Sequence, residues 1–325
     1  MHAIRQYEFG PAEKLRYEDV EDPHPGPGQV RISVRAAGVH LIDTVIRQGG
    51  AAGAYGRPEF PMTPGREVAG IVDELGDGVD TDWLGARVVT HLGPASGGYA
   101  ELAVSDVASV HALLDDVGFD TSVAMIGTGR TTMGILRFAQ LTRDDIVLVT
   151  SAAGGIGGLV VQAGRNLGAT VVGVAGGARK VERVRALGAE VAADYNDPDW
   201  TARVREELDG REITVVLDGV GGALGRGALE LLGPGGTLVM FGWASGTATH
   251  VTTDDLVDGG LTVTWVLGPA MRRWPPIRTL EKDALAELAA GRLVPDVQSF
   301  PLKDAAAAHA ALETRATLGK VVLVP

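Results

Sequence analysis

The residues best suited to chemistry form a glycine-rich turn in the middle of the chain. Residues 151–158 read Ser-Ala-Ala-Gly-Gly-Ile-Gly-Gly and follow a short apolar run at 146–149. Glycines at this spacing let a backbone approach a pyrophosphate and let the next helix pack closely on its strand. The start of that helix offers unpaired N–H groups and a partial positive charge to an anion. The turn therefore predicts a dinucleotide-binding site.

The end of the following apolar run indicates which dinucleotide is bound. NAD sites place Asp or Glu there to hold the ribose 2′-hydroxyl, whereas NADP sites favour positive charge for the 2′-phosphate. Residues 175–180 read Ala-Gly-Gly-Ala-Arg-Lys, which contains no acid and two bases, Arg179 and Lys180. A lysine supplies a point charge and an arginine can bind phosphate oxygens with two N–H groups. The alternative is that both are solvated residues at the start of a helix. The pattern favours NADPH.

These residues need a scaffold, and the chain from about residue 122 onwards supplies a regular one. Short apolar runs alternate there with segments of helical pattern; the runs are 146–149, 170–175, 190–194, 213–218 and 237–242. Alternation at this spacing predicts a parallel sheet with helices on both faces. The first third differs, because 29–35 alternates with period two and glycine-rich turns separate similar pieces. It predicts a compact, mostly β domain with one short helix over 41–48.

The composition excludes several classes of protein. With 325 residues, the chain is long for one core, so two domains are expected. The absence of cysteine excludes disulfides, cysteine nucleophiles and thiolate zinc sites. A net charge of −12 argues against a general nucleic-acid binder. No run approaches the ~18 apolar residues of a membrane helix, and the first residues lack the apolar core of a signal peptide. A cytoplasmic enzyme is expected.

Several separated motifs then point to one family. They occur in family order over nearly the whole chain, at 38–43, 64–70, 85–88, 97–101, 152–157, 187–189, 218–221 and 319–322. Each motif alone is weak, but the ordered set is specific. The chain resembles the zinc-free quinone oxidoreductases of the medium-chain dehydrogenase/reductase superfamily, the group that includes zeta-crystallin.

The resemblance implies an α/β fold in which a Rossmann doubly wound parallel sheet is combined with a GroES-like, mostly β catalytic domain. Residues 1–122, completed by 269–325, would form the catalytic domain, and 123–268 would form the NADPH-binding domain. NADPH would lie in the cleft between them. Relatives pair the edge strands of their Rossmann sheets, so a homodimer through the strand 261–267 is expected.

The resemblance also implies which residues bind NADPH. Lys180, Tyr195 and Arg315 would contact the 2′-phosphate, and Thr131, Phe241 and Gly242 would line the nicotinamide end. The full set of predicted cofactor-binding residues is Thr131, Ala153, Gly154, Gly155, Ile156, Gly157, Gly176, Lys180, Tyr195, Phe241, Gly242 and Arg315.

The same motifs argue against a metal. Zinc-dependent relatives carry a cysteine where His40 stands and a histidine where Arg66 stands. His40, Asp43 and Glu67 remain as possible ligands, but Arg66 would bring a fixed positive charge close to any cation. No metal site is predicted. Glu67 is expected to be a buried partner of Arg66, and Asp43 is expected to pair with Arg47 within the short helix.

Without a Lewis acid, the plausible acceptors of a hydride are already electrophilic, such as quinones or the β-carbon of enones. His40 could hydrogen-bond a quinone oxygen or donate a proton, although an ordinary packed histidine is equally compatible with the sequence. Many relatives have Asn at this position. Tyr55 is a second candidate donor for an enone. Trp243 and Trp265 follow strands and could form the wall of a flat substrate site, or simply pack in a core.

The predicted function is NADPH-dependent quinone reduction by metal-free hydride transfer to a flat hydrophobic acceptor. The alternative enzyme is an NADPH-dependent reductase of enones, 2-alkenals or enoyl thioesters on the same fold. A third hypothesis is a binding or structural role, since some family members are lens crystallins or bind RNA. The acidic charge argues against RNA.

Overall fold

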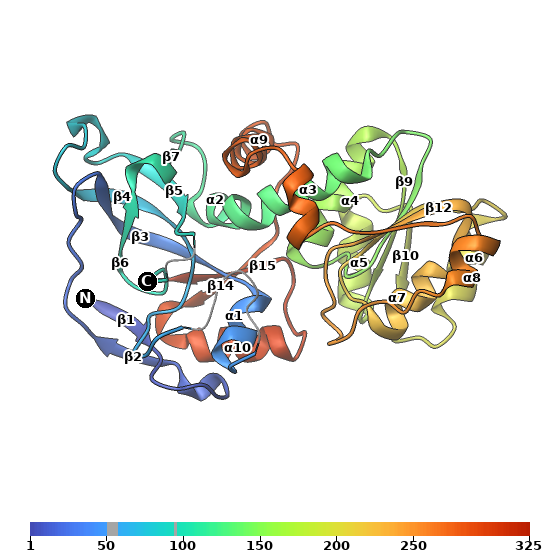
Figure 1. Cartoon of the computed structure of the whole chain (residues 1–325), viewed down its shortest axis with the longest axis horizontal. Helices are drawn as coiled ribbons and strands as arrows, with labels where there is room; N and C mark the ends of the chain where they lie inside the picture. Colours follow the sequence, from blue (N-terminus) through green and yellow to red (C-terminus); the bar gives the residue numbers. More distant parts are fainter. Residues whose placement is uncertain (51–57, 94–95) are drawn as a thin grey trace. The chain divides into compact units, whose positions relative to one another are not determined.

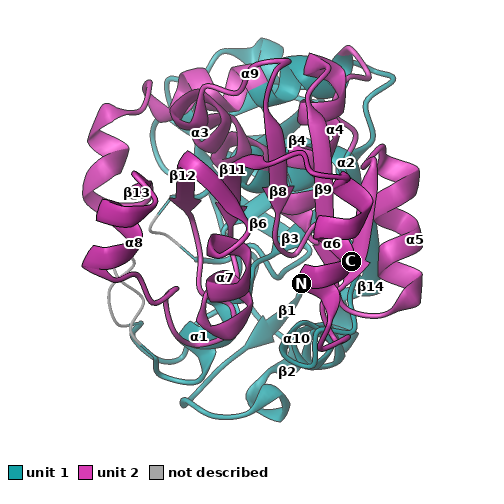
Figure 2. Ribbon diagram, turned by 90° about the vertical axis from the view of Figure 1, so that its right-hand side faces the viewer, with its two compact units in different colours: residues 1–128, 284–289, 295–325 teal, residues 129–283, 290–294 magenta. Residues whose placement is uncertain are grey.

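The structure is a computed structural model that describes residues 1–50, 58–93 and 96–325 (Figure 1). The chain divides into two compact units (Figure 2). Unit 1 comprises residues 1–128, 284–289 and 295–325, and unit 2 comprises residues 129–283 and 290–294. These units are groups of residues that pack together within the chain. They do not test the domain boundaries predicted from the sequence, which stay predictions.

Unit 2 is built on a six-stranded sheet in the order β10-β9-β8-β11-β12-β13, with every neighbouring pair parallel. The strands are β8 (Ile146–Val149), β9 (Thr170–Ala175), β10 (Val191–Asp194), β11 (Ile213–Asp218), β12 (Leu232–Met240) and β13 (Thr262–Trp265). β12 begins earlier than the predicted 237, because Leu232 already pairs with Ile213. A register shift follows this pair, and the Gly-Pro-Gly-Gly segment after Leu232 resembles a turn in the sequence.

The helices of unit 2 are α3 (Arg130–Ala139), α4 (Gly155–Leu167), α5 (Ala178–Leu187), α6 (Trp200–Leu208), α7 (Gly222–Leu229), α8 (Thr253–Asp258) and most of α9 (Ile277–Ala289). α4 packs on β8 and β9, α5 on β9 and β10, and α7 on β11 and β12. Gly173 in β9 permits this close packing, because a Cβ there would overlap Val184 of α5. Figure 2 shows β13 and α8 at one side of the unit and α5 at the other.

The strand order of unit 2 reverses its direction of winding at one point of the sheet. From β8 the chain proceeds to β9 and β10 on one side, and then returns to place β11 on the other side of β8. The direction of winding therefore reverses between β8 and β11. In open parallel sheets, ligands bind outside the carboxyl ends of the strands at this switch point. Thr150 and Asp218 stand at the two strand ends that border it.

Unit 1 contains a seven-stranded sheet in the order β14-β15-β3-β4-β5-β7, with β6 also paired to β3, and a two-stranded ribbon of β1 and β2. The strands are β1 (His2–Arg5), β2 (Arg16–Asp19), β3 (Gln29–Val39), β4 (Glu67–Leu75), β5 (Arg87–His91), β6 (Leu102–Asp106), β7 (His111–Ala112), β14 (Val297–Pro301) and β15 (Lys320–Val324). Its helices are α1 (Leu41–Arg47), α2 (Phe119–Ala124) and α10 (Ala305–Glu313).

The last strand of the chain completes this sheet. β15 pairs antiparallel with β3, so that Val321 stands opposite Val39, and Figure 1 shows the two side by side. This pairing brings Lys320 to the end of β3, next to the start of α1. In the described part of the chain, no helix has the length and apolar character needed to span a membrane.

Candidate functional site

The glycine turn has the geometry that a pyrophosphate cradle requires. The chain leaves β8 through Ser151, whose φ of 52° lies in the left-handed region, and Ala152 N–H donates to the carbonyl of Val174 in β9. α4 then starts after Gly154, with no side chain capping its N–H groups. A Cβ on Gly157 would overlap the backbone at Ser151, so only glycine fits there. The uncapped helix start can therefore accept an anion at close range.

The segments after β9 and β10 form the neighbouring part of this edge. Tyr195 follows β10, and its ring lies so near Gly176 that a Cβ there would be 2.9 Å from three ring and hydroxyl atoms. Gly177 N–H donates to Asp194 Oδ1 over 2.9 Å, which ties the two strand ends together. Lys180 stands half-buried in the first turn of α5. A tyrosine hydroxyl and an ammonium at this edge suit a phosphate ester.

The ends of β12 and β13 carry the aromatic residues of the site. The Phe241 ring packs against Gly219, and a Cβ on Gly242 would lie 2.7 Å from the Gly219 carbonyl oxygen. Beyond them, the rings of Trp243 and Trp265 stack with centroids 4.5 Å apart and planes inclined by 28°. Trp243 is 48% exposed, so the stacked pair lies partly at the surface rather than within the core. Thr131 is half-buried in the first turn of α3.

In unit 1, a buried polar cluster surrounds Glu67. This cluster consists of His40, Glu67 and Lys320. Glu67 is fully buried, with His40 Nε2 2.6 Å from its Oε1 and Lys320 Nζ 2.9 Å from its Oε2. Lys320 Nζ also lies 2.8 Å from His40 Nε2. Burial alone would raise the pKa of the Glu67 carboxyl, but the facing His40 and Lys320 hold that pKa well below its usual range.

The polar cluster has one partly open member. The side chain of His40 is 27% exposed, whereas that of Lys320 is 4% exposed. Glycines make the room for the carboxylate, because a Cβ on Gly38 or on Gly127 would overlap Glu67. His40 is therefore the group of the cluster that a ligand can reach. Its Nε2 already contacts Glu67 Oε1 and Lys320 Nζ.

Two predicted ion pairs are wrong. Arg66, rather than Arg47, pairs with Asp43, at 2.9 Å between Nη1 and Oδ1. Glu67 pairs with Lys320 and His40 instead of Arg66, since neighbouring residues on an extended chain point to opposite faces. Asp43 also accepts from the backbone N–H of His40 over 2.8 Å, which fixes the start of α1.

These pairs decide whether the side chains present suit a zinc ion. The carboxylate of Asp43 is bound to the Arg66 guanidinium, and the Lys320 ammonium contacts both His40 and Glu67. A permanent cation thus stands within 3 Å of two of the three ligands that the sequence offers. A second cation among them would meet strong repulsion. The arrangement does not fit zinc.

A buried hydrogen-bond relay continues from Asp43 and was not predicted. Tyr99 donates to Asp43 Oδ2 and lies 3.2 Å from Nε2 of His309 on α10. Arg47, only 1% exposed, approaches Nδ1 of the same histidine at 3.3 Å and also binds Glu313. Because Arg47 can only donate, His309 is neutral with its ring proton on Nε2. A lone histidine in an alanine-rich segment gave no signal of this role.

The burial of His309 predicts a pH-dependent stability. Burial lowers the pKa of this imidazole to about 4, from the ordinary value near 6.5. Between pH 6.5 and pH 4, His309 is protonated in the unfolded chain but stays neutral in the folded protein. The contribution of neutral His309 to the free energy of unfolding is therefore fully present above pH 6.5. It falls by up to about 3 kcal/mol as the pH drops to 4. Urea unfolding of the wild type and His309→Gln between pH 7.5 and pH 4.5 measures this loss, which should be smaller in the variant.

An exposed histidine provides the control for that experiment. His24→Gln removes a side chain that is 69% exposed, and its unfolding curve should follow the wild type at every pH. Equal pH dependence of His309→Gln and the wild type would contradict the role assigned to the relay.

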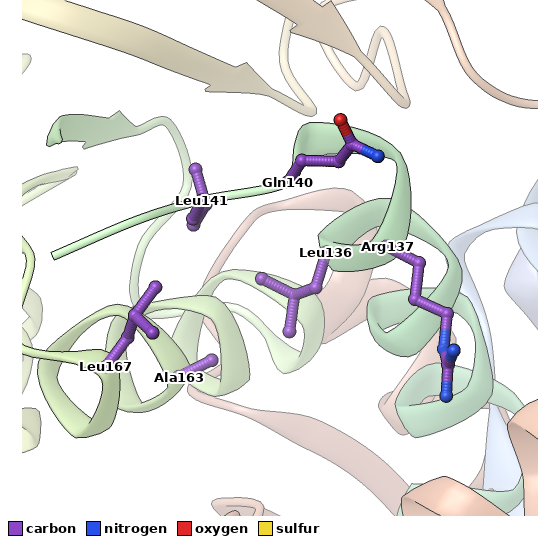
Figure 3. Close-up of a pocket in the computed structure, with 6 residues that line it drawn as sticks. All are labelled: Leu136, Arg137, Gln140, Leu141, Ala163 and Leu167. Atoms are coloured by element: carbon purple, nitrogen blue, oxygen red, sulfur yellow. The ribbon is translucent and has the colours of Figure 1, made fainter.

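Unit 2 also has a pocket that lies away from the carboxyl ends of the strands and from the glycine turn. It has a volume of about 240 Å³ and lies between α3 and α4 (Figure 3). Figure 3 shows Leu136, Leu141, Ala163 and Leu167 gathered around it, with Gln140 and Arg137 completing the lining. Ala163 and Leu167 belong to the last turns of α4, whereas the glycine turn precedes its first turn. This pocket is therefore separate from the dinucleotide-binding edge.

The predicted site residues fall into two groups. Unit 2 holds all the predicted cofactor-binding residues except Arg315, which stands exposed after α10 in unit 1 with a φ of 56°. His40 belongs to unit 1, and Tyr55 lies outside the described residues. The roles assigned to these residues stay predictions.

Comparisons with known proteins agree with this architecture. Residues 26–115 match the family model of the alcohol dehydrogenase GroES-like domain, and residues 155–283 match that of the zinc-binding dehydrogenase. A quinone oxidoreductase of Pseudomonas aeruginosa is 34% identical over 98% of this chain and 97% of its own. A 2-haloacrylate reductase of Burkholderia sp is also 34% identical, over 100% of this chain and 99% of its own. The crystal structure of Escherichia coli quinone oxidoreductase complexed with NADPH is 31% identical, covers both chains completely and superposes with a TM-score of 0.87.

A GroES-like domain joined to a doubly wound nucleotide-binding domain defines the medium-chain dehydrogenase/reductase superfamily. The predicted fold class, an α/β protein with a Rossmann sheet and a GroES-like, mostly β domain, is confirmed. Within this superfamily, the chain belongs to the quinone oxidoreductase family.

Proposed function

We propose that the protein is an NADPH-dependent, zinc-independent oxidoreductase that reduces quinones. One observation carries the proposal: the glycine turn after β8 is followed, after β9, by a half-buried lysine where an NAD site would place an acid. Lys180 offers its charge to a 2′-phosphate, and Tyr195 lies next to Gly176 at the same edge. The crystal structure of the related E. coli enzyme with NADPH supports this choice of cofactor.

The residues present fit NADPH along the whole carboxyl edge of unit 2. Glycine is required at 157 by the backbone of Ser151, so the cradle from Ala153 to Gly157 is open to a pyrophosphate. Thr131, Phe241 and Gly242 would hold the nicotinamide end, and Arg315 would add a second cation for the 2′-phosphate. Bound NADPH supplies a hydride, and the protein orients it and excludes water.

The acceptor is proposed to be flat and already electrophilic. Trp243 and Trp265 provide a stacked surface on which an aromatic quinone could rest. His40, open to a ligand in the polar cluster, would hydrogen-bond a quinone oxygen and hold a proton for it. No Lewis acid is needed for this acceptor, which agrees with the lysine ammonium that contacts both His40 and Glu67. Tyr55 remains a further candidate for contact with the substrate.

Reduction of an activated alkene is the second candidate. The related 2-haloacrylate reductase of Burkholderia sp favours it, since its substrate carries a carbon–carbon double bond conjugated to a carboxylate. An enone, a 2-alkenal or an enoyl thioester would need a proton at the α-carbon after hydride addition. His40 or Tyr55 would then be a general acid rather than a simple hydrogen-bond donor.

A spectrophotometric panel decides between the two acceptors. NADPH consumption at 340 nm is followed with naphthoquinone, phenanthrenequinone, an enone, a 2-alkenal and 2-haloacrylate. We expect kcat/KM for the better quinone to exceed that for every alkene by about tenfold or more, which corresponds to about 1.4 kcal/mol of transition-state stabilisation. A large preference for the enone or 2-haloacrylate would replace the quinone assignment by the second candidate.

Assembly and location complete the proposal. Within the part of the chain that the structure describes, the edge strand β13 pairs on one side only, with β12, and Leu256 and Val257 of the adjoining α8 are exposed. A homodimer that joins two such edges would cover them; light scattering that gives a mass of 33.7 kDa would contradict it. We place the enzyme in the cytoplasm, which cell fractionation tests. Purified protein without activity on any acceptor of the panel would favour a binding or structural role instead.

A further inference from the structure

A buried carboxylate stands at the switch point of the unit 2 sheet. Asp218 ends β11 and is 0% exposed. Its Oδ1 accepts hydrogen bonds from Thr150 Oγ1 at 2.8 Å, Val220 N at 2.9 Å and Gly221 N at 3.2 Å. Its Oδ2 accepts from Thr249 Oγ1 at 2.5 Å and from Gly221 N at 3.2 Å. The charge is thus stabilised by hydroxyl and backbone donors.

These partners come from three separate segments of the carboxyl edge. Thr150 follows β8 on the side of the glycine turn, and its hydroxyl also accepts from Gly219 N–H over 2.9 Å. Val220 and Gly221 form the turn after β11, and Thr249 belongs to the segment after β12. A carboxylate has enough lone pairs to accept all of these bonds, which a neutral side chain of the same size does not. Asp218 therefore connects the two sides of the switch point.

The turn that Asp218 organises carries the aromatic side of the site. Gly219 packs against the Phe241 ring, and its carbonyl accepts from Ala244 N–H at 3.2 Å. The carbonyl of Asp218 accepts from Phe241 N–H over 2.8 Å, and that of Val220 accepts from Ser245 N–H at 2.9 Å. The positions of Phe241 and Gly242 consequently depend on the turn at 218–221. On the other side of the switch point, Asp194 ties the ends of β9 and β10 together, because its Oδ1 accepts from Gly177 N–H and Asn196 N–H.

We propose that Asp218 is a positioning residue for the nicotinamide half of the dinucleotide, acting through Thr150 and the turn at 218–221. This inference rests on the proposed binding of NADPH. Asp218 touches no ligand itself. It holds the backbone against which Phe241 and Gly242 are set, while the adenosine half is held by segments after β9 and β10. Loss of the carboxylate should therefore weaken binding of the whole dinucleotide more than binding of its adenosine half.

Calorimetric titration with two ligands tests the proposal. NADPH spans both halves, whereas 2′,5′-ADP carries only the adenosine half with its 2′-phosphate. In Asp218→Asn, an NH2 group that can only donate replaces one of the two acceptor oxygens, so a buried N–H or hydroxyl loses its acceptor. We expect the Kd for NADPH to rise about tenfold or more and that for 2′,5′-ADP to change by less than about twofold.

Further variants keep the test decisive if Asp218→Asn folds poorly. Thr150→Val removes the bridging hydroxyl without changing side-chain size and should give the same selective loss, and Thr150→Ser should bind both ligands like the wild type. Asp194 is the matched control, because its Oδ1 accepts from Gly177 and Asn196 N–H, both at 2.9 Å, on the adenosine side. Asp194→Asn should weaken both ligands alike.

The possible outcomes separate this inference from the proposed function. Equal losses for the two ligands in Asp218→Asn and Thr150→Val, or no loss in either variant, would overturn the positioning role alone. A wild-type protein that binds 2′,5′-ADP no more tightly than 5′-AMP, and NADPH not at all, would overturn the proposed function and this inference together.

Discussion

Lys320→Met is expected to lower the free energy of unfolding by about 3–5 kcal/mol, the largest effect of any single substitution proposed for this chain. The methionine has a similar length but no charge, so the fully buried carboxylate of Glu67 loses the ammonium that faces its Oε2. Breaking a buried pair by removing one partner costs more than removing both, because the remaining charge is uncompensated. Urea unfolding at pH 7.5 measures the loss.

A double substitution is the control for this prediction. In Glu67→Gln/Lys320→Met both charges are gone, and most of the lost stability should return. Lys14→Met, which breaks an exposed ion pair with Glu8, should change the free energy of unfolding by less than about 0.5 kcal/mol. If the double variant is as unstable as Lys320→Met, the cost comes from packing around the lysine stem and not from the charge of Glu67.

Lys180→Ala is expected to weaken NADPH binding by about 10- to 100-fold while NADH binding changes by less than about twofold. A charge-assisted hydrogen bond to a phosphate contributes about 1.5–3 kcal/mol, and only NADPH carries the 2′-phosphate. Fluorescence titration with each dinucleotide gives the two dissociation constants. The ratio of the constants isolates the phosphate contact, because any general damage to the edge of the sheet would affect both ligands.

The same charge change elsewhere on unit 2 provides the comparison. Arg205 is exposed on α6 and donates to the carbonyl of Glu230, so Arg205→Ala alters the net charge without touching the carboxyl edge. Its affinity for both dinucleotides should match the wild type. Equal weakening of NADPH and NADH in Lys180→Ala would refute the assignment of this lysine to the 2′-phosphate.

The sequence predicted those features of the fold that depend on local spacing. The glycines at 154 and 157 indicated the turn because they stand between an apolar run and a helical pattern, which is the context of a phosphate-binding turn. Runs of apolar residues separated by helical patterns then predicted the parallel sheet. β12 was the exception, since its first residues contain glycine and proline and resemble a loop, although Leu232 already pairs with Ile213.

The polar contacts of unit 1 could not be predicted, because their partners are far apart in the chain. His40 and Lys320 are separated by 280 residues and meet only because β15 pairs with β3. The sequence instead suggested neighbours, Glu67 with Arg66 and Asp43 with Arg47. Alternation along a strand argues against the first of these pairs. The second has helical spacing, but Asp43 is already bound to the backbone of His40 and to Arg66.

We propose above all that this chain transfers a hydride from NADPH to a quinone without a metal. The most direct measurement is an anaerobic assay of EDTA-treated enzyme with phenanthrenequinone, in which NADPH consumption and hydroquinone formation are followed together. We predict one hydroquinone formed for each NADPH consumed, with NADH much less effective at the same concentration. No consumption of NADPH with any quinone, or activity that returns only when zinc is added, would contradict the claim.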